Sequence, residues 1–261
     1  IFKTHRKTPL PYDTTDRIAD ETSLGNTSEF YDWWSLFPYL EVIGSILYLA
    51  INTRPDIIFH VCMLARFAKN KTPQACYLAA HLLSYIAGTT AYGITYRYSL
   101  DLDRFNLISE SYFAGDYKTR RSTAGYVVFA AGAPMAWYSK LMTTIAVSTM
   151  ESEYMAAFHC AQEVIFIRNF LSEIGLEQTK PTRFRMDAQA AIDAIRNPVF
   201  HARTKHIAVK FRWLQSFVQD NNKVLDISHV VTTDMIADLL TKVVASRTWQ
   251  SLSPLIVSDA P

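Results

Sequence analysis

A change in hydrophobic period near residue 104 is the feature that most limits which fold this chain can adopt. Before it, apolar residues at helical spacing predict helices over 41–52, 57–67 and 74–87, with Pro55 and Pro73 at helix starts. After it, alternating apolar residues predict strands over 104–113, 123–130 and 134–140, and a further extended piece over 143–149. The C-terminal third then predicts helices over 150–174, 188–196, 204–220 and 233–242, and strands over 182–187 and 223–231.

The order of these elements indicates an α/β fold. Three antiparallel strands precede a helix, a strand, two helices, a strand and a last helix, which is typical of a mixed sheet with helices on its faces. We expect a linker or lead-in over 1–37, a small helical region over 38–98, the sheet domain over 104–245 and a C-terminal tail over 246–261.

Composition narrows the class of protein. Of the 261 residues, 49% are apolar and 19% charged, which allows a sizeable core and excludes wholesale disorder. The longest near-continuous apolar run, residues 42–51, is far shorter than the roughly 20 residues that cross a bilayer, so we expect no membrane span. The N-terminus lacks an initiator Met and resembles the cut end of a longer polypeptide. Three widely spaced cysteines, Cys62, Cys76 and Cys160, favour a reducing compartment.

The charge is locally uneven although the net charge is only +2. That balance argues against nucleic-acid binding by the field of the whole protein. Residues 194–219 contain no acidic residue and hold Arg196, His201, Arg203, Lys205, His206, Lys210 and Arg212. A smaller basic group near residue 120 consists of Lys118, Arg120 and Arg121. Each group is either a solvated face or a phosphate-binding surface.

Four acidic residues lie where predicted elements end or turn inward: Glu110, Glu153, Asp187 and Asp238. A parallel crossover between the first and fourth strands brings Glu110 and Asp187 side by side at strand ends, where α/β sites form. Several adjacent carboxylates cannot all stay ionised without cations, and oxygen ligands favour Mg²⁺ or Mn²⁺. Two such ions about 3.5–4 Å apart activate water for attack on a phosphodiester. Taken singly, each acid is also compatible with a surface or capping role.

A set of sequence blocks gives the chain a family resemblance. Residues 39–67 read YLEVIGSILYLAINTRPDIIFHVCMLARF, residues 85–93 read YIAGTTAYG, and later blocks read RRSTAGYV (120–127), WYSK (137–140), STMESEY (148–154), TKHI (204–207) and ADLLTK (237–242). In this order they resemble the C-terminal part of copia-type (Pseudoviridae-like) retrotransposon Pol polyproteins, where the reverse transcriptase thumb precedes ribonuclease H. The resemblance covers about three-quarters of the chain.

The resemblance implies a ribonuclease H-like mixed five-stranded sheet and endonucleolytic cleavage of the RNA strand of RNA·DNA hybrids. It implies that Glu110, Glu153, Asp187 and Asp238 hold two Mg²⁺ ions, with Mn²⁺ as a substitute. It also implies an upstream reverse transcriptase as partner and a cytoplasmic virus-like particle as location. The residues expected to contact the hybrid are Arg120, Arg121, Arg203, Lys205, His206, Lys210 and Arg212. No Tyr-x-Asp-Asp occurs, so this fragment carries no polymerase site.

The first acidic block departs from the family pattern. The family usually has S-D-A-D-W-A-G-D, whereas residues 109–116 read SESYFAGD, so Glu110 replaces the bridging Asp and Tyr112 the second Asp. An extra methylene moves a carboxylate by about 1.5 Å, and about 1 Å of misplacement can cost roughly a hundredfold in rate. Two alternatives stay open: a catalytically decayed nucleic-acid-binding or interaction module, and a transposase or integrase of the same fold, against which the thumb-like block argues.

Overall fold

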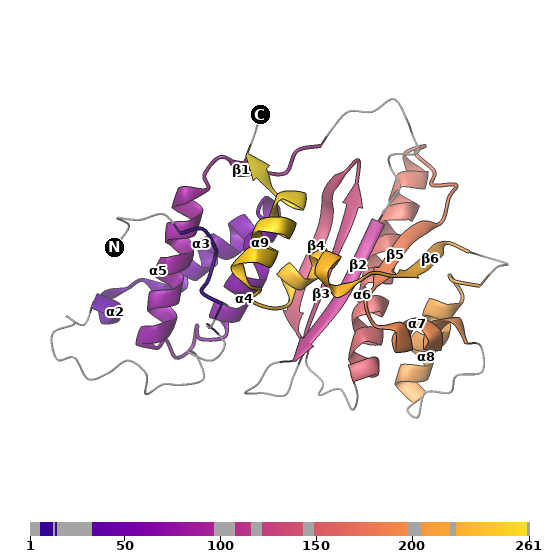
Figure 1. Cartoon of the computed structure of the whole chain (residues 1–261), viewed down its shortest axis with the longest axis horizontal. Coiled ribbons are helices and arrows are strands. Elements are labelled where there is room, and N and C mark those ends of the chain that lie inside the picture. Colours follow the sequence, from indigo (N-terminus) through magenta and orange to yellow (C-terminus); the bar gives the residue numbers. More distant parts are fainter. Residues whose placement is uncertain are drawn as a thin grey trace. The chain divides into compact units, whose positions relative to one another are not determined.

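The computed structural model describes residues 6–12, 14, 33–96, 108–115, 122–142, 149–197, 205–219 and 223–259, with only the backbone for 108–115, 122, 149 and 205–208. The chain divides into two compact units, a helical unit and a sheet unit (Figure 1). The helical unit comprises Ile1–Thr95, Tyr117–Thr119 and Lys242–Pro261, and the sheet unit comprises Tyr96–Asp116 and Arg120–Thr241. In the described part of the chain, no helix is long and apolar enough to cross a membrane.

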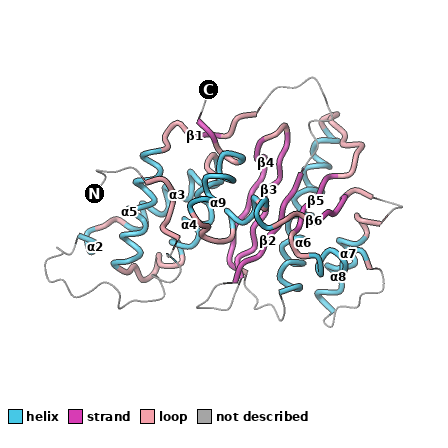
Figure 2. Tube along the Cα trace, in the orientation of Figure 1, coloured by secondary structure: helices cyan, strands magenta, loops and turns pink. Residues whose placement is uncertain are grey.

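The helical unit contains the three helices predicted before residue 98. It is built from α2 (Trp33–Leu36), α3 (Tyr39–Asn52), η1 (Pro55–Ile57), α4 (Ile58–Ala65), α5 (Pro73–Gly88), α9 (Ser246–Leu252) and η6 (Ser253–Leu255), with β1 (Tyr92–Gly93) antiparallel to β7 (Ser258–Asp259) (Figure 2). Helix α5 starts where the sequence predicts, because Pro73 occupies a first-turn position and the Thr72 side chain accepts a hydrogen bond from the Ala75 amide at 3.1 Å.

A buried ion pair organises the helical unit. The guanidinium of Arg54 donates to both carboxylate oxygens of Asp56 at 2.8 Å, and Tyr85 donates to Asp56 at 2.9 Å. Arg54 also donates to the carbonyl and hydroxyl oxygens of Thr89, at the end of α5. Arg54 and Asp56 are 3% and 0% exposed, so the T-R-P-D segment ties the turn after α3 to the end of α5.

The C-terminal residues do not form a tail apart from both domains. That expectation for 246–261 is wrong, because Lys242–Pro261 belong to the helical unit. Trp249 of α9 is buried, and its ring lies edge-on to His60 at 5.5 Å and to Tyr85 at 6.0 Å between centroids. Most of the predicted lead-in lies outside the described residues, but Leu10, within it, is buried.

The sheet unit confirms the predicted fold class, a ribonuclease H-like α/β fold. Its strands run in the order β4-β3-β2-β5-β6, with β2–β3 and β3–β4 antiparallel and β2–β5 and β5–β6 parallel. Its elements are β2 (Ile108–Gly115), β3 (Ser122–Ala130), β4 (Ala133–Leu141), α6 (Thr149–Glu173), β5 (Thr182–Met186), α7 (Gln189–Arg196), α8 (Lys205–Gln215), β6 (Leu225–His229), η4 (Thr232–Asp234) and η5 (Ile236–Leu240).

The two faces of this sheet are covered differently. Alternate β3 residues, Tyr126 and Val128 among them, share one hydrophobic core with α6, α7 and α8. Gly125 faces the other way, where a Cβ atom would lie 2.5 Å from Thr241 Cγ2 and 3.0 Å from the Leu240 carbonyl. Helix α6 and turn η5 therefore pack on opposite faces of the sheet.

Two predicted helices differ from the structure. The expected helix over 233–242 is wrong: Met235 is extended, and two short 3₁₀ turns, η4 and η5, take its place. Helix α8 ends at Gln215, before the predicted 220, because the Phe217 carbonyl accepts hydrogen bonds from Val224 and Leu225 as the chain turns into β6. The extended piece expected over 143–149 falls outside the described residues except for Thr149, which begins α6.

The close approach at Gly125 predicts a selective loss of stability. We expect Gly125→Ala to lower the free energy of unfolding by about 1–3 kcal/mol, because the added methyl forces η5 away from β3. Gly44 in α3 is the matched control: nothing lies within 4 Å of its Cβ position. Gly44→Ala should raise stability by about 0.5–1 kcal/mol through helix propensity. Urea denaturation of both variants measures the difference, and equal effects would contradict the packing account.

Burial of His60 predicts a pH dependence of stability. Burial lowers the pKa of His60 from 6.5 to about 3, since its ring packs between Phe59 and Trp249. The neutral form is thus favoured on folding, so its contribution is complete above pH 6.5 and declines as pH falls towards 3. Between pH 6.5 and 4.5, His60→Phe and His60→Leu should each remove a slope of about 1.4 kcal/mol per pH unit from the unfolding free energy. A wild-type slope in both variants would refute this role.

Candidate functional site

The centre of the candidate site is the short parallel pairing between β2 and β5. Ile108 pairs with Arg183, Ser109 with Phe184 and Glu110 with Arg185, and there the pairing ends. Strand β2 continues to Gly115 beside β3 alone. Residue 110 is therefore the last β2 position flanked by strands on both sides, and Asp187 follows β5 two residues beyond Arg185. The predicted adjacency of positions 110 and 187 at the strand ends is present in the backbone.

Asp187 is held by the end of β6 and by the turn that follows it. Its carbonyl oxygen lies 3.1 Å from Nε2 of His229, and its Oδ2 accepts a hydrogen bond from Thr232 at 3.5 Å. Sequence analysis did not identify His229 or Thr232 as site residues. The signal was available, because a strand parallel to β5 must place its end beside Asp187, as the pairing of Met186 with His229 shows.

Among the predicted acidic residues whose side chains the structure describes, Glu153 and Asp238 are the two most buried. Glu153, in the second turn of α6, is 4% exposed, and Asp238, in η5, is 3% exposed. A charged group so deeply buried requires compensation from hydrogen bonds, opposite charges or a metal ion. The chemistry of an all-oxygen set, two buried members and one half-buried, fits a hard divalent cation.

Three of the predicted acidic residues lie on β2 or on elements that contact it, and Asp187 directly follows β5, which pairs with β2. Strand β5 pairs with β2, and both α6 and η5 contact β2 and β3. Because α6 and η5 cover opposite faces, Glu153 and Asp238 approach the sheet from opposite sides. Glu153 and Asp238 can therefore belong to one site only beyond the end of the β2–β5 pairing. There the two strands are no longer paired, so they do not separate the two faces of the sheet.

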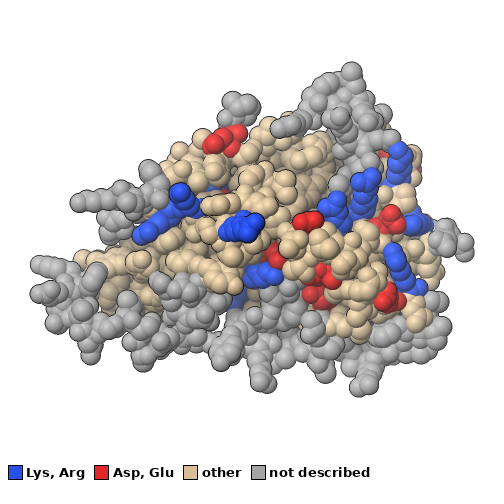
Figure 3. Space-filling view, viewed as in Figure 1, with Lys and Arg blue, Asp and Glu red and all other residues tan. Residues whose placement is uncertain are grey.

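The described side chains alone do not complete a metal site. Among them, no three His, Cys, Asp or Glu groups lie close enough to hold one ion. Glu110, whose side chain is outside that description, is the remaining donor of the predicted set. Among the described residues on the right of Figure 3, acidic and basic side chains lie next to one another.

Of the predicted hybrid-contacting residues, the structure describes two side chains, both on α8. Arg212 is exposed and Lys210 is half-buried. Within the helix sequence KHIAVKFRWLQ every charge is positive. Arg120, Arg121 and Arg203 lie outside the described residues, and Lys205 and His206 are described by their backbone alone.

Comparison with known proteins identifies relatives of most of the chain. It is 36% identical over 220 residues to the "Retrovirus-related Pol polyprotein from transposon TNT 1-94" of Nicotiana tabacum, covering 84% of this chain and 16% of the polyprotein. It is 34% identical over 218 residues to that "from transposon RE1" of Arabidopsis thaliana, covering 84% and 15%. The chain thus spans about one-sixth of these relatives. No family model matches.

Two further comparisons concern shorter proteins. "Secreted RxLR effector protein 161" of Plasmopara viticola is 35% identical over 130 residues, which is 50% of this chain and 91% of that protein. Among solved structures, the N-terminal RNase H domain of rv2228c from Mycobacterium tuberculosis has 14% identity and a TM-score of 0.39, covering 56% of this chain and 96% of that one.

Proposed function

Because the chain belongs to the retrovirus-related Pol polyproteins of copia-type transposons, we propose that its sheet unit is a metal-dependent ribonuclease H. It would cleave the RNA strand of RNA·DNA hybrids during reverse transcription. We further propose that it acts beside the upstream reverse transcriptase of its polyprotein, in the cytoplasmic virus-like particle of a retroelement.

One observation carries this proposal: the parallel β2–β5 register, which sets position 110 beside the start of the Asp187 segment. The contacts of α6 and η5 with β2 support the same site, because these elements carry the buried Glu153 and Asp238. Glu110, Glu153 and Asp187 would hold two Mg²⁺ ions, and Asp238 would complete one coordination shell. When bound, such ions activate water and stabilise the leaving oxygen of a phosphodiester.

The protein's own residues would contribute position and charge. Thr232 and His229 fix the orientation of Asp187 through the contacts at its side chain and carbonyl. The basic residues of α8 and its preceding segment, with Arg120 and Arg121, would contact phosphates, which position a hybrid without reading its sequence.

Glu110 favours a second candidate, a nucleic-acid-binding module that has lost catalysis. A Glu at the bridging position extends the carboxylate by about 1.5 Å relative to Asp. Binding and cleavage therefore have to be measured separately.

Glu110→Asp tests the proposal directly. If only the bridging carboxylate is misplaced, this variant should raise the cleavage rate of a labelled RNA·DNA hybrid by about tenfold or more, with unchanged affinity. The reason is that phosphate contacts set binding, whereas carboxylate position sets transition-state stabilisation. Glu173→Asp, the same change at the exposed end of α6 outside the acidic set, is the control and should have no effect. Background cleavage by wild type and Glu110→Asp in both Mg²⁺ and Mn²⁺ would favour the binding module.

Metal binding can be followed without cleavage. Repulsion among the carboxylates should be relieved by a bound cation, so Mn²⁺ should raise the melting temperature of the wild type. Asp238→Asn should melt at a higher temperature than wild type in EDTA, because it removes one of the repelling charges, and should gain less from Mn²⁺. Differential scanning calorimetry with and without Mn²⁺ measures both. An Mn²⁺ response that Asp238→Asn leaves intact would exclude Asp238 from the site.

A further inference from the structure

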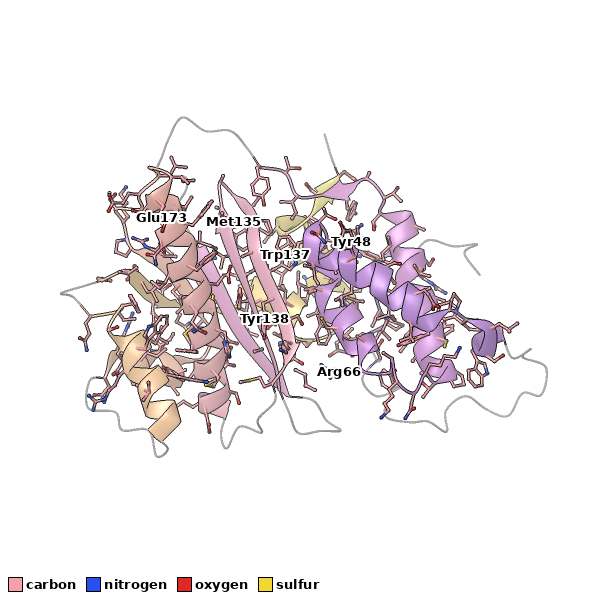
Figure 4. All side chains as sticks on the ribbon, turned by 180° about the vertical axis from the view of Figure 1, so that it is seen from behind. Tyr48, Arg66, Met135, Trp137, Tyr138 and Glu173 are labelled. Atoms are coloured by element: carbon pink, nitrogen blue, oxygen red, sulfur yellow. The ribbon has the colours of Figure 1, made fainter. Side chains whose placement is uncertain are left out.

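A short aromatic stack joins the sheet to α6 on the face opposite Gly125. Tyr126 of β3 and Tyr138 of β4 stack with 5.2 Å between ring centroids and 8° between planes. Tyr138, labelled in Figure 4, also lies 6.5 Å from the ring of His159 in α6. The hydroxyl of Tyr126 donates to Glu163 at 3.3 Å, which fixes the inner end of the stack. His159 forms its half-buried outer end.

Lys210 approaches the same part of α6 from α8. Its ammonium lies 5.3 Å from the centre of the Phe158 ring and 3.9 Å from Sδ of Met155. Phe158 is held in place by Trp213, 5.2 Å away. Within the described side chains, Lys210 contacts a ring face and a thioether and no carboxylate. Its charge is thus positioned but not neutralised there.

Lys140 supplies a third basic group. It follows Tyr138 by two residues in β4, so it lies on the same sheet face, and it is exposed. The three groups are near enough to interact: burial chiefly lowers the pKa of His159, and the positive charges of Lys210 and then Lys140 lower it further. The acidic groups of α6 nearest to His159 in sequence are Glu163, which is bonded to Tyr126, and then the buried Glu153.

We propose that Lys140, His159 and Lys210 form a binding site for the phosphodiester backbone of a polynucleotide, on the sheet face opposite Asp238. The three residues come from β4, α6 and α8, and two of them lie outside the basic segment 194–219. Because cations around an imidazole repel one another, a bound anion stabilises them by reducing this repulsion. A nucleic-acid strand carries regularly spaced phosphates, and a strand bound at this site would extend them along α8, whose charged residues are all basic.

The site couples binding to proton uptake. A bound phosphate offsets the repulsion from both lysines and raises the pKa of His159, so the protein takes up a proton as it binds. Affinity should therefore rise as pH falls from 7.5 to 5.5, by at most about tenfold per pH unit for one proton. The hydrogen bond between Gln162 and His159 also raises the pKa of His159, and it is present in both states.

This proposal rests on the proposed function only because it takes a polynucleotide as the ligand. Binding is measured in EDTA, which prevents metal-dependent cleavage and so separates hybrid binding from catalysis. The probe is a fluorescein-labelled 16-base-pair RNA·DNA hybrid, whose anisotropy is measured from 50 to 200 mM salt with wild type, Lys140→Gln, His159→Gln and Lys210→Met. Lys210→Met keeps the contact with Phe158. Lys223→Gln is the matched control, because it removes an exposed cation of the same unit that pairs with Asp226 at 2.9 Å.

Lys140→Gln and Lys210→Met should each reduce the magnitude of the slope of log affinity against log salt by about 0.7–0.9, the value for one lost phosphate contact. The control should keep the wild-type slope, and His159→Gln should abolish the pH-dependent gain. Unchanged slopes in both lysine variants, or a pH gain that persists in His159→Gln, would overturn the site. Displacement of the hybrid by inorganic phosphate at low millimolar concentration would also overturn it, by assigning the site to free phosphate. Hybrid binding with these effects in EDTA, together with background cleavage by wild type and Glu110→Asp in both Mg²⁺ and Mn²⁺, would leave the site standing and refute the ribonuclease.

Discussion

The candidate site depends on the three-residue parallel pairing of β2 with β5. A longer pairing would close the sheet past residue 110 and separate the α6 face from the η5 face along the whole of β2. A shorter one would leave positions 110 and 187 without a common edge. The pairing ends at Glu110 and Arg185, while β2 continues for five residues beside β3 alone. The end of this pairing is therefore the one place in the candidate site where Glu153, on the α6 face, and Asp238, on the η5 face, can lie close together.

The helical unit depends on a different interaction, the buried Arg54–Asp56 pair. Two charges this deeply buried stabilise a fold only if their remaining hydrogen-bonding groups are satisfied. Tyr85 and Thr89 provide those partners, so a turn between two helices and the end of a third are fixed together. The T-R-P-D segment thus has a structural explanation within the helical unit that involves no catalytic chemistry.

Sequence periodicity predicted most of the helices and strands correctly. The three antiparallel strands and the parallel crossover followed from alternation and element order, and the crossover rule alone placed Glu110 beside Asp187. Periodicity failed at residues 233–242, where five consecutive buried residues in η5 are set by packing against β3 and not by helix propensity. The glycine at 125 belonged to a recognised block, but its reason, contact with Thr241, required the structure.

Contacts between distant segments were the part that the sequence could not provide. Lys140, His159 and Lys210 come from three elements, and no spacing rule links them. His229 was within reach of reasoning from strand order, because β6 runs parallel to β5 and ends beside Asp187. Glu153 was placed near the start of a long helix by its sequence, whereas its burial depends on how α6 crosses the sheet.

Anomalous X-ray diffraction from crystals of this chain soaked in Mn²⁺ tests the central claim most directly. The account predicts two manganese peaks about 3.5–4 Å apart at the end of the β2–β5 pairing, in contact with Glu110, Glu153, Asp187 and Asp238. Manganese bound elsewhere, with Glu153 and Asp238 kept apart by the sheet, would contradict it.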